Sequence, residues 1–470
     1  MRNYITIALV LITAIGFSQS WKGTLDAGGQ KIELFLVVEA KGTAHTSYWK
    51  IPAQNLPKLP SSDTQMTTDS IKVSIKMIQG AFKARKLADQ SLDGQWEQSG
   101  YKIPLKMTPC SAADLAQELV RPQTPKAPFP YQVEDIQYKG SKTGLTYGAT
   151  LTHPTGSSPA PALILITGSG QQDRDENILS HKPFALIADY LTRKGWAVLR
   201  IDDRGKGKTT GNFAQSTTLD FADDVREHIA YLKTRTDIDS KRIGLCGHSE
   251  GGLIAPMVAA SDASVAFTIL LAGPGVTCEE VMVSQNKALL AEQGWPEESL
   301  NKYLDLYRAM FKEAYAKSTE SLTDRFAKKV TDWMKTTPEA TVSRTTGITD
   351  EASKSAFVKS YADAFDNPWW HTFAGLDPAP YLKKVRCPIL ALNGSKDVQI
   401  VADINLEGIR QNTMKNKQVR IQKMEGLNHL FQKCTQCTVA EYGTIETTME
   451  PEVLAVMAEW LNGLAVLGKK

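Results

Sequence analysis

The sequence has little net charge, no basic run and no long apolar stretch beyond its N-terminus. Its 54 lysine and arginine residues nearly balance its 51 aspartate and glutamate residues. Because charges of both signs are interspersed, nothing indicates a nucleic-acid surface. No apolar run after the N-terminus approaches the length of a bilayer span, so we expect no membrane span there. A chain of 470 residues is long enough for two or three domains.

The N-terminus has the parts of a signal peptide. Arg2 precedes the 13-residue apolar run ITIALVLITAIGF, and small residues stand at Gly16 and Ser18. Such a run is short for a bilayer span, which disfavours the alternative of an uncleaved anchor. We therefore predict a signal peptide over residues 1–18 and a protein that is periplasmic or secreted. Lipid attachment is not expected, because no cysteine stands at the cleavage site.

Cysteines are few, and one pair lies close together in the sequence. Export permits disulfides, and Cys434 and Cys437 in KCTQC are near enough to form a local one. Two unpaired loop cysteines are the alternative. A structural zinc site is not favoured, because it needs four ligands and there is no second pair. Cys246 and Cys387, in apolar strand contexts, are expected to be buried free thiols.

Residues 19–120 are expected to form a small antiparallel β domain. Apolar residues alternate in KIELFLVVE and IKVSIKM, so that every second side chain faces the same side. Two further strands are predicted to turn at Ser99-Gly100. The stretch carries no catalytic constellation, so a scaffolding or covering role is expected. Residues 121–130 are rich in proline and indicate a stiff linker.

Beyond the linker, strands and helices alternate. Continuous apolar strands such as PALILITG and CPILALNG are separated by helical segments, which is typical of a parallel sheet covered on both faces. The sequence therefore predicts an α/β fold, a doubly wound and mostly parallel sheet formed by residues 131–275 and 376–470. Residues 276–375 are too long for a loop and repeat apolar residues at helical spacing, which predicts a helical cap insertion.

Three glycine-rich strings invite a functional interpretation, and two of them fail. GKGKTTG resembles the end of a phosphate-binding loop, but the position five residues before Gly207 holds Asp202 instead of glycine. TGSGQQD follows a strand as a dinucleotide-binding loop does, but Asp173 occupies its third glycine position. We therefore expect no nucleotide cofactor.

The third string, GHSEGG, places Ser249 between a strand and a helix. A nucleophilic serine occupies a strained turn of this kind, where flanking side chains would collide with neighbouring backbone. Gly247 and Gly251 meet that demand, RIGLC supplies the strand and GLIAPMVAA the helix. Ser249 is therefore predicted to be a catalytic nucleophile.

A serine nucleophile needs an acid and a histidine base, which follow it in that order in such a fold. Of seven histidines, His371 and His429 lie after the serine. His429 follows the last predicted strand, where the base is expected, whereas His371 leaves the insertion with no late-strand acid before it. Asp397, just past a strand end, is the predicted acid, and Asp403 is the alternative.

The oxyanion of a tetrahedral intermediate needs backbone N–H donors. Glu250 N–H, directly after the nucleophile, is the first candidate. The second is expected in the loop after LILIT, where Ser169 N–H is favoured and Gly170 is next. The charges of Asp173–Asp175 either order this loop by ion pairing or form a solvated charge run.

Taken together, these strings resemble the α/β-hydrolase superfamily, and within it bacterial serine carboxylesterases preceded by a small β domain. The resemblance rests on TGSGQQDRDEN, DDRGKGKTTG, GHSEGG, LALNGSKD and LNHLFQ. It departs from the group at Thr167, where the usual pattern has histidine. It implies a small-molecule ester substrate, with short acyl groups expected, that is hydrolysed through an acyl-enzyme without metal or cofactor.

Substrate preference is expected to depend on the insertion, where Trp369, Trp370 and Phe373 either line a pocket or pack within the cap. A serine peptidase or amidase with the same residues is the first alternative function. A non-catalytic binding protein with this fold is the second, and the complete, ordered set of three residues argues against it. The sequence does not define the oligomeric state.

Overall fold

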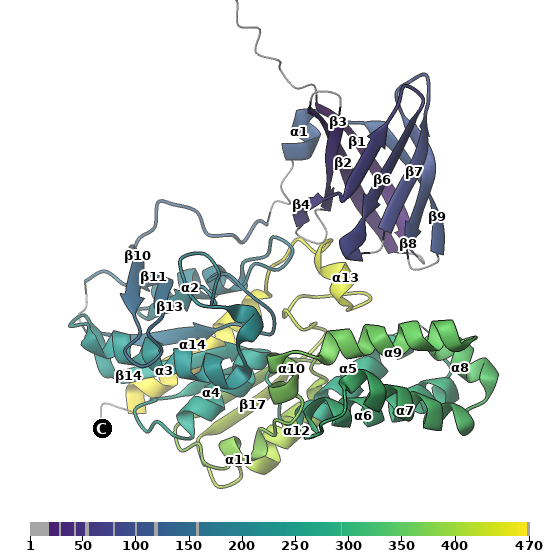
Figure 1. The fold of residues 1–470 in the computed structure, drawn as a ribbon. Coiled ribbons are helices and arrows are strands. Elements are labelled where there is room, and N and C mark those ends of the chain that lie inside the picture. The colour runs from purple at the N-terminus through teal and green to yellow at the C-terminus, as the bar shows by residue number, and fades with distance from the viewer. Residues whose placement is uncertain are drawn as a thin grey trace, which may run out of the picture. The chain divides into compact units, whose positions relative to one another are not determined.

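The computed structural model describes residues 18–27, 30–41, 44–51, 56–78, 80–98, 101–116, 121–156, 159–292 and 294–467. The chain divides into two compact units (Figure 1). The β unit comprises Met1–Val120 with Tyr442–Thr444, and the α/β unit comprises Arg121–Glu441 with Ile445–Lys470. The predicted signal peptide lies outside the described residues except for Ser18, which begins the first strand.

The β unit is one antiparallel sheet of nine strands in the order β4-β3-β2-β1-β9-β8-β7-β6-β5. The sheet curves round on itself (Figure 1). Its strands are β1 Ser18–Ala27, β2 Gln30–Lys41, β3 Ala44–Ile51, β4 Leu56–Pro60, β5 Asp63–Met66, β6 Ser70–Ile75, β7 Gly80–Lys86, β8 Leu92–Gln98 and β9 Tyr101–Pro109. The 3-10 helix η2 (Lys76–Ile78) and helix α1 (Ala112–Ala116) complete it.

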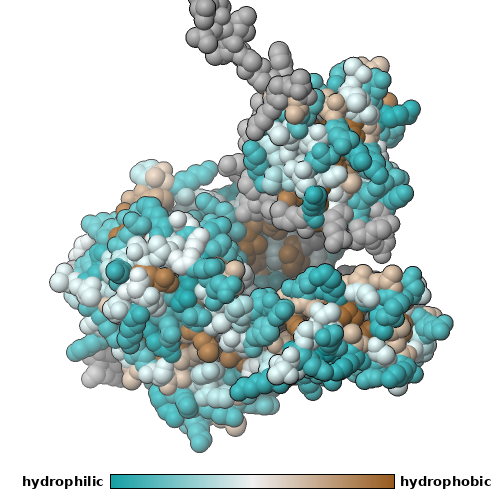
Figure 2. Space-filling view, in the orientation of Figure 1, coloured by the Kyte–Doolittle hydropathy of each residue, from teal (hydrophilic) through white to brown (hydrophobic). Residues whose placement is uncertain are grey.

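Alternating side chains build the core of the β unit, as their pattern predicts. In β6, Ile71, Val73 and Ile75 are buried and the residues between them are not. Trp49 packs edge-on against Phe82 inside the sheet, with ring centroids 5.6 Å apart. On the face shown in Figure 2, the surface of this unit is mostly hydrophilic or neutral. The predicted turn at residues 99–100 lies outside the described residues, but β8 and β9 pair antiparallel on either side of it.

The α/β unit is built on an eight-stranded sheet in the order β10-β11-β13-β12-β14-β15-β16-β17. β11 is antiparallel to both of its neighbours, and the other neighbouring pairs are parallel. The strands are β10 Gln132–Lys139, β11 Thr146–His153, β12 Ala160–Ile166, β13 Ala197–Ile201, β14 Ile238–His248, β15 Thr268–Leu271, β16 Ile389–Gly394 and β17 Val419–Met424.

Helices cover both faces of this sheet. The first face carries α3 (Thr218–Thr234), α4 (Glu250–Ala259) and α12 (Ala402–Asn412), and the second carries α2 (Pro183–Thr192) and α14 (Pro451–Leu467). Successive strand residues enter different cores, so that Leu245 faces α3 and α4 while Cys246 faces α2 and α14. The predicted doubly wound, mostly parallel fold class is confirmed. Short elements η3 (Phe213–Gln215), α11 (Ala379–Leu382) and α13 (Val439–Tyr442) connect the rest.

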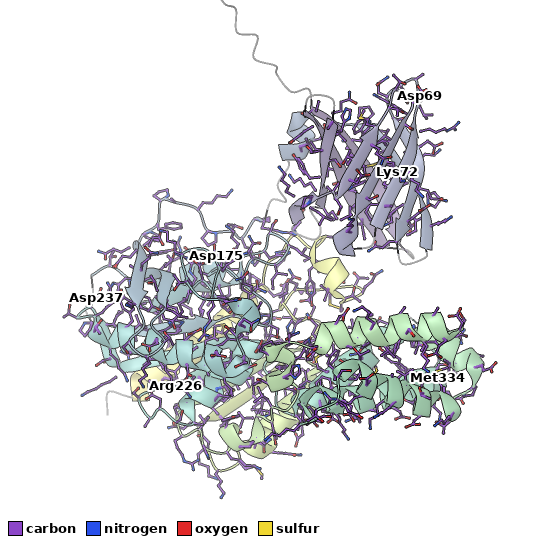
Figure 3. The ribbon with its side chains drawn as sticks, in the orientation of Figure 1. Asp69, Lys72, Asp175, Arg226, Asp237 and Met334 are labelled. Atoms are coloured by element: carbon purple, nitrogen blue, oxygen red, sulfur yellow. A yellow bond between two sulfur atoms is a disulfide. The ribbon has the colours of Figure 1, made fainter. Side chains whose placement is uncertain are left out.

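A helical insertion separates β15 from β16. Its helices in the described part of the chain are α5 Cys278–Glu292, α6 Glu297–Tyr315, α7 Leu322–Lys335, α8 Glu339–Thr346, α9 Glu351–Phe365 and α10 Pro368–Phe373. They pack around a core of their own, which includes Phe311, Phe326 and Phe365. Met334, labelled in Figure 3, lies on α7 at the far part of this cap. None of the helices in the described ranges is long and apolar enough to cross a bilayer.

Two strands and the linker differ from what the sequence pattern indicates. β10 is an edge strand of mainly polar residues, and β11 is buried yet contains Thr150 and Thr152, so neither shows a simple apolar pattern. Residues 121–130 form no helix or strand, as their prolines predict. However, Arg121 donates to the Leu179 carbonyl at 2.7 Å, and Gln123 donates to the Met449 carbonyl at 2.8 Å. These hydrogen bonds hold the start of the proline-rich segment against the rest of the α/β unit.

Candidate active site

Ser249 lies at the sharp junction between β14 and α4. Its φ of 54° is in the left-handed region, which a non-glycine residue adopts only when the surrounding structure holds it there. A Cβ on Gly247 would overlap the Gly251 carbonyl, and one on Gly251 would overlap the Ile166 carbonyl. The chain therefore approaches itself too closely here for flanking side chains, as the sequence predicts, and Ser249 is held half-buried at the end of the sheet.

The loops that carry the predicted acid and base meet the serine at one edge of the sheet. Because β14, β15, β16 and β17 run parallel, their carboxyl ends lie at the same edge. Asp397 comes three residues after the end of β16, and His429 five residues after the end of β17. A Cβ on Gly394, the last residue of β16, would lie 2.5 Å from the Asn428 carbonyl oxygen. This glycine lets the histidine loop pack directly on the acid loop.

Asp397 and His429 form a buried pair. Nδ1 of His429 lies 2.8 Å from Oδ2 of Asp397, and both residues are 4% exposed. The second carboxylate oxygen, Oδ1, accepts the N–H groups of Gln399 and Ile400 at 2.8 and 2.9 Å. These bonds fix the carboxylate, and they leave Nε2 as the ring nitrogen for proton transfer. Among the described residues Ser249 Oγ makes no hydrogen bond to His429, and such contacts often tighten only when substrate binds.

The alternative base, His371, and the alternative acid, Asp403, lie away from this pair. His371 is exposed on α10, where Nε2 is 3.0 Å from Oδ1 of Asp366. The side chain of Asp403 is 80% exposed and forms an ion pair with Lys423. The structure therefore places Asp397, and not Asp403, against His429.

The loop after β12 runs beside the nucleophile. A Cβ on Gly168 would lie 3.1 Å from Cβ of Ser249. Ser169 and Gly170 follow in this loop and are exposed. Glu250 is the first residue of α4, where an N–H has no acceptor within the helix. The candidate oxyanion donors thus belong to the two segments that flank Ser249.

Ion pairs order this loop, so its charges are not a solvated run. Arg174 donates to both carboxylate oxygens of Asp202, at 3.0 and 2.6 Å. Asp175, labelled in Figure 3, forms an ion pair with Arg200. Asp173 accepts the backbone N–H of Asp175 at 3.0 Å, which closes a local turn. The acidic and basic side chains therefore hold the loop against β13.

Thr167 has a hydrogen-bond partner of its own. Its hydroxyl donates to Oδ1 of Asp203 at 2.8 Å, and Gln172 N–H donates to Oδ2 at 2.6 Å. Burial raises the pKa of Asp203 to about 7, against the effect of these two hydrogen bonds, and the charges of Glu176 and Glu250 act in the same direction as burial. The residue that departs from the resembled group thus contacts a carboxyl that titrates near neutral pH.

The Glu250 side chain connects the elbow to the cap. Its Oε1 accepts hydrogen bonds from Trp369 Nε1 at 2.8 Å and from the Thr218 hydroxyl at 2.6 Å. The Ser169 side chain also lowers the pKa of this carboxyl. Burial raises the pKa of Glu250, although these hydrogen bonds oppose the shift. Trp369, a predicted substrate residue, therefore contacts the residue next to the nucleophile.

The other two predicted substrate residues mainly pack. Phe373 is buried in a cluster with Leu253 and stacks on Trp369, with ring centroids 4.6 Å apart. Trp370 stacks on Phe365 of the cap core at 4.4 Å. Both join the cap to α4, since their neighbours come from the cap and from that helix.

Two further polar residues of the site have no counterpart in the sequence prediction. Glu176 and His248 are 1% and 5% exposed, and Oε1 of Glu176 lies 3.0 Å from Nδ1 of His248. The same oxygen accepts the Gly168 N–H at 2.9 Å. His248 Nε2 lies 3.1 Å from the His429 carbonyl oxygen. The histidine in GHSEGG and the glutamate in DRDEN are the signals that mark these residues.

Cys434 and Cys437 are joined in a disulfide, the first of the two possibilities left open by the sequence. With Glu441 they are the described residues whose ligand atoms lie near enough for a metal ion, within 4.8 Å of one another. Sulfurs in a disulfide supply no thiolate, so this group does not suit a metal in its oxidised form. Cys246 is buried as predicted, whereas Cys387 is only half-buried.

The strand order, the helices on both faces and the strained Ser249 turn are those of an α/β-hydrolase fold. The family described as serine aminopeptidase, S33 matches residues 180–336, which include Ser249 but neither Asp397 nor His429. Esterase EstD of Thermotoga maritima is 34% identical over 139 residues. This match covers 30% of the present chain and 33% of that esterase.

Solved structures show similarity over a larger part of the chain but at low identity. An esterase of Pyrococcus furiosus is 15% identical, with a TM-score of 0.43, over 71% of this chain and 91% of that one. A 2,6-dihydroxy-pseudo-oxynicotine hydrolase is 16% identical, with a TM-score of 0.41, over 72% of this chain and 69% of that one.

Proposed function

We propose that the protein is a serine carboxylesterase that hydrolyses carboxylic esters, with short acyl groups expected, through an acyl-enzyme. The chief support is the buried Asp397–His429 pair, at the sheet edge where Ser249 is held in a strained turn. The partial match to an esterase supports a carboxylic ester as the bond that is cleaved.

In the first half-reaction, Ser249 Oγ attacks the ester carbonyl carbon while His429 Nε2 takes the hydroxyl proton. The oxygen of the tetrahedral intermediate accepts hydrogen bonds from the N–H groups of Glu250 and Ser169. Asp397 stabilises the imidazolium through Nδ1–H. When the intermediate collapses, the C–O bond to the alcohol breaks, His429 returns the proton to that oxygen, and the acyl group stays on Ser249.

In the second half-reaction, a water molecule replaces the alcohol. His429 Nε2 takes a proton from this water as its oxygen attacks the acyl carbon. Collapse of the second intermediate returns the proton to Ser249 and releases the carboxylic acid. The same residues hydrolyse an amide if the leaving amine is protonated, so a peptidase or amidase remains the second candidate, favoured by the serine aminopeptidase family match.

We further propose that the protein is exported, with residues 1–18 removed. The apolar run near the N-terminus supports this proposal. The disulfide between Cys434 and Cys437 is in keeping with an oxidising compartment. An N-terminal sequence that begins at Gln19 in protein from the extracytoplasmic fraction is the expected result, and cytoplasmic protein that retains Met1 contradicts export.

One experiment tests the nucleophile and the substrate class together. The mature protein is treated with a fluorophosphonate, and the modified peptide is identified by mass spectrometry. We expect modification of Ser249 and its loss in Ser249→Ala. The same two proteins are then assayed on p-nitrophenyl esters of increasing acyl length and on aminoacyl-p-nitroanilides. Faster cleavage of the anilides by the wild type would contradict the esterase assignment and favour an aminopeptidase.

A further inference from the structure

We propose that Glu176 and His248 form a proton-holding pair that positions the oxyanion loop and the His429 loop together, so that loss of its proton sets the alkaline limit of activity. This inference rests on the proposed function, since it assigns positioning roles in the same reaction. Neither side chain takes part in the proposed chemical steps.

The pair is connected to three segments that the reaction needs. Oε1 of Glu176 accepts the Gly168 N–H at 2.9 Å, which fixes the start of the oxyanion loop. His248 directly precedes the nucleophile, Ser249, in the chain. Its Nε2 lies 3.1 Å from the backbone carbonyl of His429, the proposed base. One buried hydrogen-bonded chain therefore runs from the oxyanion loop, past the elbow, to the histidine loop.

The hydrogen-bonded chain from Gly168 to His429 needs one proton more than a neutral imidazole and a carboxylate carry together. The carbonyl oxygen of His429 can only accept, so Nε2 of His248 must carry a hydrogen. Glu176 Oε1 already accepts from Gly168, and at 3.0 Å from Nδ1 it needs a second hydrogen between them. A neutral imidazole has one N–H, whereas an imidazolium has two. A protonated His248 beside an ionised Glu176 satisfies every contact.

The surroundings of His248 suit this charge state. The titratable groups that face it in the described part of the chain are Glu176 from the β12 loop, His429 from the β17 loop and Asp397 from the β16 loop. Burial alone would disfavour the imidazolium, but the Glu176 carboxylate, the His429 carbonyl and the charge of Asp397 together outweigh burial and raise the pKa of His248 above its ordinary value. The small cavity around the pair is otherwise lined by apolar side chains, which include Phe184, Ile187, Leu271, Leu430, Phe431 and Met449.

The sign of the pH effect follows from the raised pKa. The interaction is complete below the ordinary histidine pKa of about 6.5 and is lost as the pH rises through the higher value of the folded protein. Once His248 is neutral, its single N–H cannot serve both Glu176 and the His429 carbonyl. One of the two loops is then released, and activity falls.

The test compares pH profiles of kcat/KM for p-nitrophenyl acetate. In Glu176→Gln, the imidazolium has lost its carboxylate, so the alkaline limb should move towards acid by at least one pH unit, roughly the effect of a lost charge partner. Asp173→Asn is the matched control, because this acid lies in the same loop and bonds to backbone N–H groups rather than to His248. Its alkaline limb should stay in place. A Glu176→Gln profile that is lowered at every pH without a shift overturns the proposal.

A second measurement does not depend on activity or on the stability of that variant. Nitrogen NMR of the His248 ring in Ser249→Ala should show both ring nitrogens protonated at pH 7, where a free histidine is mostly neutral. A neutral ring with hydrogen on Nε2 alone would overturn the proposal. If fluorophosphonate labelling of Ser249 fails while this NMR result holds, the proposed function is wrong and the proton-holding pair stands.

Discussion

In the described part of the β unit, the buried side chains are apolar or aromatic with the exception of Ser47, whose hydroxyl bonds to those of Ser61 and Thr64. The α/β unit also has large apolar cores, but it buries carboxylates and imidazoles at the carboxyl edge of its sheet, among them Asp397 and His429. Burying a charged group costs free energy unless a partner compensates.

The difference between the two units shows where the chain places its chemistry. Among its described residues the β unit buries no carboxylate, imidazole, lysine or arginine side chain. In the α/β unit, each of the acids next to the elbow has a specific partner: Glu176 with His248, and Glu250 with Trp369. Such a concentration of buried, hydrogen-bonded ionisable groups is typical of a functional site.

The largest effect on activity is expected from removing the general base. His429→Ala leaves the serine without a proton acceptor, so kcat on p-nitrophenyl acetate should fall by about 10⁵-fold or more. His371→Ala removes an exposed histidine of the cap and should change kcat by less than about threefold. Steady-state kinetics of both variants measure this difference. Near-native turnover in His429→Ala would show that another residue is the general base.

The acid provides the next largest effect. Asp397→Asn keeps the shape of the side chain but no longer stabilises the imidazolium, so kcat should fall about 10³- to 10⁴-fold with little change in KM. Asp403→Asn is the matched control, because that carboxylate is exposed and pairs with Lys423. Equal losses in the two variants would contradict the assignment of Asp397.

A smaller effect is expected from the disulfide near the base. Cys434→Ser opens a short loop that follows His429, and the loop-closure entropy of a ring this small corresponds to about 2 kcal/mol of unfolding free energy. Urea unfolding of wild type and variant measures this difference. Peptide mapping without reductant should show the linked cysteines, and two freely alkylated thiols in exported protein would contradict the disulfide.

The smallest effect on activity is expected from removing the β unit. Because Arg121 and Gln123 bind within the α/β unit, a fragment that starts at Arg121 keeps these contacts. Its kcat/KM on short esters should lie within about threefold of the full-length value, since each unit has its own core. A soluble, folded fragment without activity would show that the β unit contributes to the site.

The contrast between the two units also bears on how much of the fold and the site could be predicted from the sequence. The alternation of Ile71, Val73 and Ile75 predicts a β strand, because burial on one face leaves a period of two. Because Ser249, Asp397 and His429 each follow a strand of the parallel part of the sheet, the sequence predicts that they lie at one sheet edge, and Asp397 and His429 are in contact there.

Other features leave no periodic signal. β11 is buried although it contains Thr150 and Thr152, and their polar groups need partners that only the fold supplies. The Glu176–His248 pair joins residues 72 positions apart, so neither residue predicts the other. Trp369 donates its indole N–H to Glu250, a contact that depends on how the cap packs on the elbow.

The most direct test of the central claim, that Ser249 forms an acyl-enzyme, is rapid-quench mass spectrometry with p-nitrophenyl acetate. Acid quenching in the first turnover should reveal wild-type protein heavier by one acetyl group, with the group on the peptide that contains Ser249. Ser249→Ala should carry no acetyl group under the same conditions. An unmodified wild-type protein that still releases nitrophenol at its full rate, or an acetyl group on another residue, would contradict the account.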